Sequence, residues 1–470
     1  MKGENMKKFF SIIVSIFTLC GILASCSDKI VYNVVQSPPP EKSGYELFYL
    51  PNEEESGYIV YCAQYYGEGE IVIPPTYRDM PVVGIGNFAF RDCSGLLKIE
   101  LPDSITSIGI SAFEGCSGLT DIELPDGVIY IGDFSFSGCV GLVNIKIPDT
   151  VTNIGEGAFD GCSSLALNYY SDGLYLGNDD NNYVVLLKTR DKMITANTVN
   201  ESTRIIYHKA FFECDKLNEV NVSASVISIG REAFRGCSKL HRVSFAENSS
   251  LTDIGRGAFE FCSISNLTVP NSVRRIGDYA FRGCGNLNGI TFDKIGKLSD
   301  IGVSAFENCT NLKRIDLPEN IDLIGDRAFA GCVSVTEINI PDGVSTLGKS
   351  AFENCNSLIG VIIPGSVKRL GDSAFKNCAE LWDIILSQGV ISIGNDVFYG
   401  CRNLSMITLP NSIKDIGMGA LSGCGELSSI KYGGTKEQWT TVVKNSGWNS
   451  GVGKYSVGCA DGTLTESEGG

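Results

Sequence analysis

Cysteine is the residue type in this sequence with the greatest potential for chemistry. The chain has 18 cysteines but only two histidines, His208 and His241. Most of the cysteines recur at a regular spacing, which is 23 residues in the clearest stretches. The recurring cysteines are Cys93, Cys116, Cys139, Cys162, Cys214, Cys237, Cys262, Cys284, Cys309, Cys332, Cys355, Cys378, Cys401 and Cys424. Thiols at a fixed spacing could form disulfides, bind metal ions or supply nucleophiles.

The pattern argues against each of these uses. Repeats that stack like neighbouring strands, about 4.8 Å apart, bring the cysteines within disulfide range, but thiols that all point the same way cannot readily adopt the required twist. Metal sites usually combine C-x-x-C pairs or histidines, and neither accompanies these cysteines. We therefore interpret them as a column of buried, reduced thiols, although export would favour disulfides. Cys62 and Cys459 fall outside the column, and their redox state stays open.

The other candidates for chemistry are weak. His241 occupies an outward strand position beside Arg242, which fits a solvated surface residue. Asp179 and Asp180 lie in a Gly/Asn/Asp stretch without the spacing of a calcium loop, so a polar hairpin turn explains them better. No Ser/His/Asp or Cys/His set can be assembled around the histidines. The sequence predicts no catalytic residue, no metal site and no cofactor, and an enzyme is the weakest functional alternative.

The cysteines are positioned by a repeated unit, which is clearest at Leu96–Cys116 (LLKIELPDSITSIGISAFEGC). Leu96, Ile99 and Leu101 face inward from a short strand between polar residues, and Pro102 ends that strand because it lacks an N–H group. The second half of the unit adds two apolar positions, a turn glycine and an Ala-Phe pair before the cysteine. A fixed period of about 20–29 residues with this pattern predicts a leucine-rich-repeat solenoid.

We expect about 14 coils of about 23 residues, with a parallel β-sheet on the concave face and short strands and helical turns on the other side. The regular spacing is interrupted between Cys162 and Cys214, where apolar runs flank Gly177–Asn182. This stretch predicts a hairpin-like insertion that adds to, or replaces part of, one coil.

The N-terminus has the features of an export signal. Residues 1–25 predict a lipoprotein signal peptide, because a pair of lysines precedes an apolar run and Leu23-Ala24-Ser25-Cys26 resembles a lipobox. Cys26 would carry the lipid, and residues 26–44 would form a lipid-anchored tether. An ordinary secretory signal is the alternative.

The remaining segments are the solenoid and its two ends. We assign residues 45–80 to an N-terminal cap, 81–432 to the solenoid with an irregular coil at 163–213, and 433–470 to a C-terminal cap and tail. Atypical ends are expected because terminal repeats must cover the exposed core. The net charge of −16 argues against a nucleic-acid partner, since phosphate binding needs a basic surface.

The unit, written [LV]-x-x-[IV]-x-[LI]-P-x-x-[IV]-x-x-[IL]-G-x-x-[AV]-F-x-x-C, resembles the BspA-like leucine-rich repeats of bacterial surface lipoproteins. The resemblance covers about Ile71–Tyr432. It implies surface adhesion, meaning the binding of host extracellular-matrix proteins or of other bacteria, and it carries no catalytic residues. The commoner leucine-rich repeats carry a buried asparagine, but this chain has mostly Ser, Thr or Gly at that position, so we expect no asparagine ladder.

Functional information lies in the outward strand positions, which are polar in most coils. Three adjacent coils differ, and Ile359 should lie beside Trp382, and Ile362 beside Ile385. A contiguous exposed apolar patch usually marks a partner surface, and Trp is a favoured binding anchor. The candidate ligand-binding residues are Ile359, Ile362, Trp382, Asp383, Ile385 and Met406. Alternatively, the C-terminal segment with its two tryptophans folds over the patch, or an oligomer contact uses it.

The sequence therefore predicts an extracytoplasmic, lipid-anchored, monomeric protein, displayed at the surface of a bacterial cell. It would bind a macromolecular partner through the concave face of the solenoid, with a protein favoured and no enzymatic activity. An envelope scaffold or a glycan-capture accessory protein is the alternative.

Overall fold

The computed structural model describes residues 45–65 and 69–466 of the chain. These residues form a parallel β-solenoid of about 17 turns with almost no helix. The leucine-rich-repeat solenoid predicted from the sequence is confirmed, although it has more coils than expected, because segments without the repeat cysteine also wind into turns. The predicted signal peptide, Cys26 and the tether lie outside the described residues.

One side of the solenoid carries the strands that begin each repeat unit, and we call their outward surface the long-strand face. The strands are β3 (Gly69–Val72), β6 (Leu96–Glu100), β8 (Asp121–Glu123), β10 (Asn144–Lys146), β15 (Ala196–Thr198), β17 (Glu219–Val222), β19 (Arg242–Phe245), β21 (Asn266–Thr268), β23 (Gly289–Thr291), β25 (Arg314–Asp316), β27 (Glu337–Asn339), β29 (Gly360–Ile363), β31 (Asp383–Leu386), β33 (Met406–Leu409), β35 (Ser429–Tyr432) and β37 (Tyr455–Cys459). Their inward residues, such as Ile99 and Ile122, are buried, as the alternation predicted.

A second side carries strands that are mostly two residues long. They are β5 (Met80–Ile85), β7 (Ser107–Ile108), β9 (Tyr130–Ile131), β11 (Asn153–Ile154), β14 (Val185–Thr189), β16 (Ile205–Ile206), β18 (Ser228–Ile229), β20 (Asp253–Ile254), β22 (Arg275–Ile276), β24 (Asp300–Ile301), β26 (Leu323–Ile324), β28 (Thr346–Leu347), β30 (Arg369–Leu370), β32 (Ser392–Ile393), β34 (Asp415–Ile416) and β36 (Val443–Lys444). From β14 to β36 they form one continuous sheet.

The third side of each coil consists of tight turns, and α2 (Lys436–Thr441) is the one helix in the described ranges. Two residues per coil have a left-handed backbone, as Ser111 (φ 52°) and Gly115 (φ 74°) show. The second position is Gly or Asn in most coils, because these residues adopt positive φ at the lowest cost. The turn position must be glycine for another reason, which is crowding between coils. A Cβ on Gly109 would lie 2.6 Å from the backbone nitrogen of Asn87 in the preceding coil.

Two parallel columns fill the interior. Phenylalanine rings stack coil upon coil, and the ring centroid of Phe306 lies 5.2 Å from those of both Phe281 and Phe329. Beside the rings, twelve of the fourteen repeat thiols donate a hydrogen bond to a carbonyl of the preceding coil, as Cys116 Sγ does to Phe90 O at 3.0 Å. The repeat cysteines are free thiols, in agreement with the predicted reduced column.

The irregular coil contains β12 (Asn168–Tyr170) and β13 (Gly173–Leu176), which form an antiparallel sheet with β14. The predicted hairpin-like insertion is therefore present, with one strand more than a simple hairpin. Tyr207 stands where other units have the turn glycine, and it continues the ring column. Its ring centroid lies 5.9 Å from that of Phe159, and its hydroxyl accepts a hydrogen bond from the Phe159 backbone N–H at 3.2 Å.

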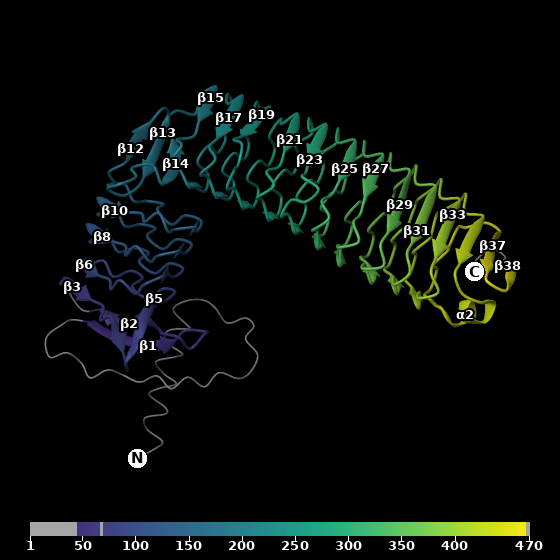
Figure 1. The fold of residues 1–470 in the computed structure, drawn as a ribbon, viewed down its shortest axis with the longest axis horizontal. Coiled ribbons are helices and arrows are strands. Elements are labelled where there is room, and N and C mark those ends of the chain that lie inside the picture. The colour runs from purple at the N-terminus through teal and green to yellow at the C-terminus, as the bar shows by residue number, and fades with distance from the viewer. Residues whose placement is uncertain (1–44, 66–68, 467–470) are drawn as a thin grey trace, which may run out of the picture.

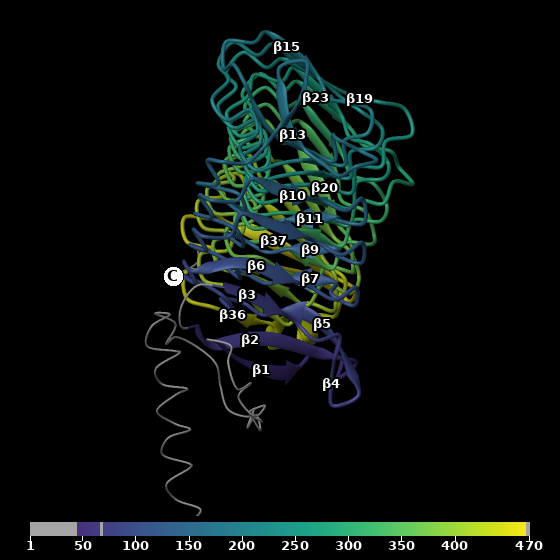
Figure 2. The same ribbon diagram turned by 90° about the vertical axis from the view of Figure 1, so that its left-hand side faces the viewer.

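The solenoid bends at this irregular coil. The short-strand sheet ends at β11 and a new one begins with the inserted strands and β14. The long strands form five sheets, with one break at the bend, between β10 and β15, and three more within the C-terminal arm. Figure 1 shows two arms that meet at the bend, with β12 and β13 at the outer corner. In the view of Figure 2 the C-terminal arm lies behind the N-terminal arm.

The position of the longer strands at the bend differs from the expectation. Figure 1 draws β6, β8 and β10 along the outer side of the bend, and β15 and β17 likewise. Beside the bend these strands therefore do not line the concave side that the sequence analysis assigned to them.

Both ends of the described solenoid are closed by distinct structures. At the N-terminal end, β1 (Tyr45–Pro51) pairs in antiparallel fashion with β2 (Tyr58–Tyr65), and the predicted hairpin turn joins them. A further short strand, β4 (Thr76–Tyr77), pairs with β5. At the other end, β37 pairs with β38 (Gly462–Glu466), and α2 begins with a capping box formed by Thr435 and Gln438.

Candidate functional site

The six candidate binding residues lie together on the long-strand face. Ile362 pairs with Ile385 in the register of β29 and β31, and the Trp382 backbone N–H donates to Ile359 O at 3.0 Å. Both neighbour relations predicted from the repeat period are therefore confirmed. We call this set, Ile359, Ile362, Trp382, Asp383, Ile385 and Met406, the apolar patch.

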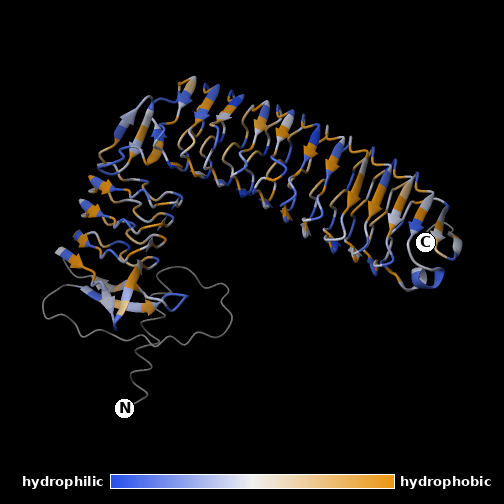
Figure 3. Ribbon diagram, in the orientation of Figure 1, coloured by the Kyte–Doolittle hydropathy of each residue, from blue (hydrophilic) through white to orange (hydrophobic). Residues whose placement is uncertain are grey.

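Large apolar side chains of the patch are exposed to solvent. The exposed fractions are 48% for Ile359, 59% for Ile362, 52% for Trp382 and 36% for Ile385. Met406 is half-buried on the next strand. In Figure 3, β29 and β31 carry more hydrophobic colour than β25 and β27, which bear charged or polar residues on either side of a buried isoleucine. The patch thus departs from a face that is polar in most other coils, although Val72 and Leu97 are also exposed near the N-terminal end.

Polar residues border the patch along the stack. Ile385 is followed on the next coil by Thr408, and then by Lys431. The Ser405 N–H donates to Trp382 O at 3.1 Å, so Ser405 succeeds Trp382 in its row. On the opposite side, the Ile359 N–H donates to Thr336 O at 3.3 Å. The apolar surface therefore spans three coils, as expected from the sequence.

Asp383 is the charged residue within the patch. In the strand register it lies between Gly360 on β29 and Met406 on β33, so no cationic residue flanks it. Its Oδ1 atom is buried and has no hydrogen-bond partner within the described part of the chain. Several other carboxylates of the same face are paired, as the Arg314 side chain shows with Asp316 at 2.7 Å and Glu337 at 3.1 Å.

The C-terminal tryptophans do not cover the patch. Trp439 and Trp448 are buried, and their ring centroids lie 6.3 Å apart in an edge-on contact. Trp439 also contacts Tyr432, the last residue of β35, at 5.2 Å. These rings close the end of the core, so the chain up to Glu466 leaves the patch open and the intramolecular alternative is not supported.

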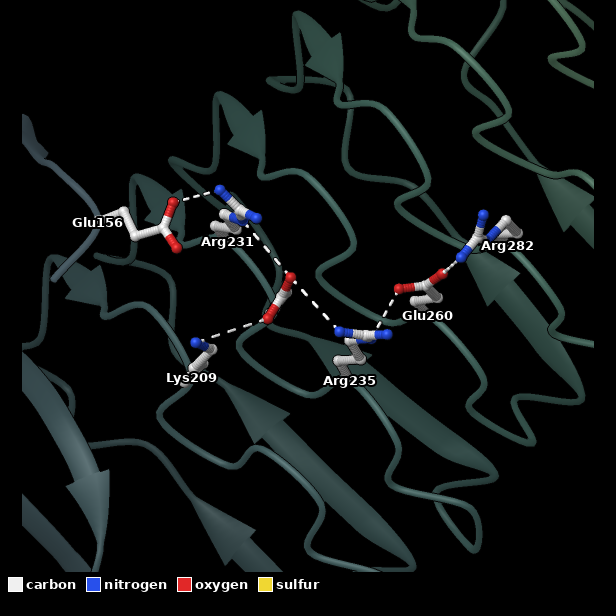
Figure 4. A network of polar contacts seen from close by, with 7 residues as sticks. Glu156, Lys209, Arg231, Arg235, Glu260 and Arg282 are labelled. Atoms are coloured by element: carbon white, nitrogen blue, oxygen red, sulfur yellow. Dashed lines mark hydrogen bonds and ion pairs between the residues drawn. The ribbon is translucent and has the colours of Figure 1, made fainter. Parts of the chain in front are cut away.

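A cluster of charged side chains lies on the turn side next to the bend, and it was not predicted from the sequence. Figure 4 shows an ion network in which Arg231 pairs with Glu156 of the N-terminal arm. Glu260, whose side chain is 5% exposed, pairs with Arg235 at 2.8 Å and with Arg282. Alternating charges around the Ala-Phe pair of successive units could have indicated the network. The network links neighbouring coils, so we interpret it as a contribution to the structure and not as a binding site.

The two histidines lie in different environments, one buried and one exposed. His208 is buried next to Tyr207, and burial, followed by the charge of Lys209, lowers its pKa. His241 is exposed on the long-strand side, as predicted. Within residues 45–65 and 69–466, no group of three or more His, Cys, Asp or Glu side chains is arranged to hold a metal ion.

Two cysteines near the N-terminal end differ from the column. A hydrogen bond from Cys62 lowers the pKa of the half-buried Cys93 thiol, against the effect of burial. In the column, burial raises the thiol pKa, to about 12 at Cys139. Cys459 is half-buried in β37, and partial burial also raises its pKa.

The two-sheet coil, the stacked phenylalanines and the recurring leucine positions define a leucine-rich-repeat solenoid. The family model described as the BspA type leucine rich repeat region matches the chain in six copies, over residues 83–177, 203–335 and 322–443. The chain therefore belongs to the BspA-type leucine-rich-repeat family, as the resemblance of its repeat unit indicated.

Solved structures with similarity to the chain come from several bacteria. A leucine-rich repeat protein from Bacteroides ovatus is 26% identical, with 89% of this chain and 97% of that chain covered and a TM-score of 0.40. A leucine rich cell surface protein from Faecalibacterium prausnitzii is 24% identical, with 87% and 99% covered and a TM-score of 0.38. A Treponema pallidum leucine rich repeat protein is 25% identical, with 59% and 91% covered and a TM-score of 0.24.

No curated protein matches the chain. The described residues contain no helix that is both long enough and apolar enough to cross a membrane.

Proposed function

We propose that this chain is a non-enzymatic, lipid-anchored binding protein of the bacterial cell surface. It recognises a protein partner through the long-strand face, as a monomer, and host matrix proteins or other bacteria would supply that partner. The observation that carries the proposal is the apolar patch, because exposed apolar side chains on adjacent coils are typical of a partner surface. Family membership and the cell-surface relative from Faecalibacterium prausnitzii support the location.

The mechanism of binding is non-covalent contact on a preformed surface. The patch residues are held by parallel strand pairing, so little conformational freedom would be lost on binding. Trp382 is the natural anchor, since tryptophan is enriched among residues that dominate binding energy. The proposal uses the long-strand face as a whole and does not require it to be concave.

A pull-down with the chain from Ser27 onward, using matrix proteins and intact bacteria, tests this function. Trp382→Ala should weaken capture by about thirtyfold or more, since truncating a central aromatic anchor commonly costs about 2 kcal/mol or more, and each 1.4 kcal/mol is a factor of about ten. Tyr130→Ala is the matched control, because Tyr130 is an exposed aromatic residue of the short strand β9, far along the chain from the patch. Unchanged capture by Trp382→Ala would contradict the proposal.

The lipid anchor is tested separately by fatty-acid labelling of the full chain. The label should be incorporated into the native chain and lost in Cys26→Ser.

Glycan capture remains the second candidate because of one feature of the insertion. Tyr169 and Tyr170 are exposed neighbours on β12, and Arg190 lies over the Tyr169 ring at 5.3 Å from its centroid. Exposed aromatic rings can serve as platforms for sugars. Loss of glycan binding in Tyr169→Ala, with no effect of Trp382→Ala, would favour this alternative.

A further inference from the structure

We infer that the partner presents a cationic side chain, Arg or Lys, set among apolar groups, and that the Asp383 carboxylate binds it. This inference rests on the proposed function and specifies the chemistry of the partner at the same site. It starts from the charge at the centre of the apolar patch. Asp383 and Ile385 stand two residues apart on β31 and therefore face the same way.

Asp383 lacks the neighbours that neutralise other carboxylates of the long-strand face. Glu100 is paired with Lys98 at 2.8 Å, and Glu219 with Arg242 at 3.8 Å. Asp383 has Gly360 and Met406 in the corresponding places, and it forms no ion pair with any residue that the structure describes. Gly360 also leaves open space beside the carboxylate, since a Cβ there would meet only Asp383 O, at 3.4 Å.

One carboxylate oxygen of Asp383, Oδ1, is already removed from water without a hydrogen-bond partner, so further loss of water from this side chain would be costly. A partner that covers Ile362, Ile385 and Met406 also removes water from Asp383. A purely apolar partner would leave the carboxylate buried without compensation, which is unfavourable. A cationic group in contact with Asp383 would offset this free-energy cost by forming a complementary charge pair. Such pairs mainly confer specificity.

Trp382 adds a second reason to expect a cation. It directly precedes Asp383 in the chain, and half of its side-chain surface is open. The face of an indole ring attracts guanidinium and ammonium groups. Arginine suits this combination best, because its planar head can bond a carboxylate and lie on an aromatic ring. The occupant is therefore a protein segment with one basic residue between aliphatic or aromatic residues.

Immobilised short synthetic peptides test this inference without knowledge of the natural partner. The peptides carry varied apolar flanks around a central residue that is Arg, Lys, citrulline, norleucine or Glu. The native chain should favour Arg and Lys centres over citrulline by about tenfold, and added salt should reduce the difference. Quenching of Trp382 by iodide reports occupancy of the site, because Trp439 and Trp448 are buried.

Variants separate this inference from the proposed function. Asp383→Asn, which is nearly isosteric, should abolish the preference for Arg and Lys, and Asp383→Lys should favour Glu centres. A preference for Arg and Lys that survives in Asp383→Asn would overturn the inference while leaving the patch as a binding site. Binding that is unchanged in Trp382→Ala would instead overturn the proposed function. Unaltered thermal denaturation shows that each variant is folded.

Discussion

Cysteine closes each repeat for two reasons, and the sequence shows one of them. Its small apolar side chain fits a buried corner of the coil, as the spacing predicts. The structure adds that the thiol donates to a backbone carbonyl of the preceding coil, as Cys309 Sγ does to Phe281 O at 3.3 Å. It is a second bond to that carbonyl, which also accepts from the Cys284 backbone N–H at 3.1 Å. The repeat spacing alone does not predict which atom of the preceding coil the thiol will contact.

The environments of the thiols near the N-terminal end predict that these cysteines react with alkylating reagents at different rates. In the folded chain, iodoacetamide near neutral pH should modify Cys93 before Cys116, because the thiolate is the reactive form. The hydrogen bond from Cys62 lowers the pKa of Cys93, whereas burial raises that of Cys116. Peptide mass spectrometry at increasing reaction times measures the order. The two rates should converge in denaturant, and equal rates in the folded chain would contradict the prediction.

The apolar patch shows what the sequence can predict of a site. A constant repeat length places equivalent residues of neighbouring coils side by side, so the contacts of Ile359 with Trp382 and of Ile362 with Ile385 follow from counting. The unpaired state of Asp383 does not follow from the residue types alone, because long basic side chains on other coils could have reached it. The Glu156–Arg231 pair was unpredictable for a similar reason, since it crosses the irregular coil.

At the scale of the coil, backbone conformation explains the residue preferences of the turn side. The position before each cysteine has positive φ in nearly every unit and is usually Gly or Asn. Glu213 occupies this position with φ 57°. A residue with a Cβ is disfavoured there by about 1–2 kcal/mol relative to glycine. The sequence shows the preference for Gly and Asn but does not reveal that two left-handed residues occur in each turn.

This conformation predicts that Glu213→Gly stabilises its coil. We expect a gain of up to about 1 kcal/mol, because relief of the left-handed strain exceeds the entropy that glycine adds to the unfolded chain. Glu213 is exposed, so little packing is lost. Hydrogen exchange of the coils around Cys214 measures the change. Glu213→Ala, which keeps the Cβ, is the control and should have little effect; equal stabilisation by both variants would refute the role of φ.

At the scale of the whole molecule, the bend divides one repeat array into two arms. The buried residues form two hydrophobic clusters, and Tyr207 belongs to the N-terminal cluster while the adjacent Phe211 belongs to the C-terminal one. The sequence located the irregularity from the widened cysteine spacing. It could not give the direction of the bend, which depends on how the inserted strands β12 and β13 pack at the corner.

Stability in a repeat array is approximately a sum of coil and interface contributions, so a weak interface can uncouple its two sides. The short-strand sheet is interrupted at the bend, and the Tyr207 ring, from the coil that ends at Cys214, packs on Phe159 of the N-terminal arm, so it is one of the links between the arms. Tyr207→Ala should cost about 3–5 kcal/mol at this interface. Urea denaturation followed by hydrogen exchange should then show the arms unfolding in separate steps. Phe306→Ala, of similar size but within the C-terminal arm, should destabilise that arm alone. A single transition shared by both arms in Tyr207→Ala would show that other contacts, such as the Glu156–Arg231 pair, are sufficient to couple them.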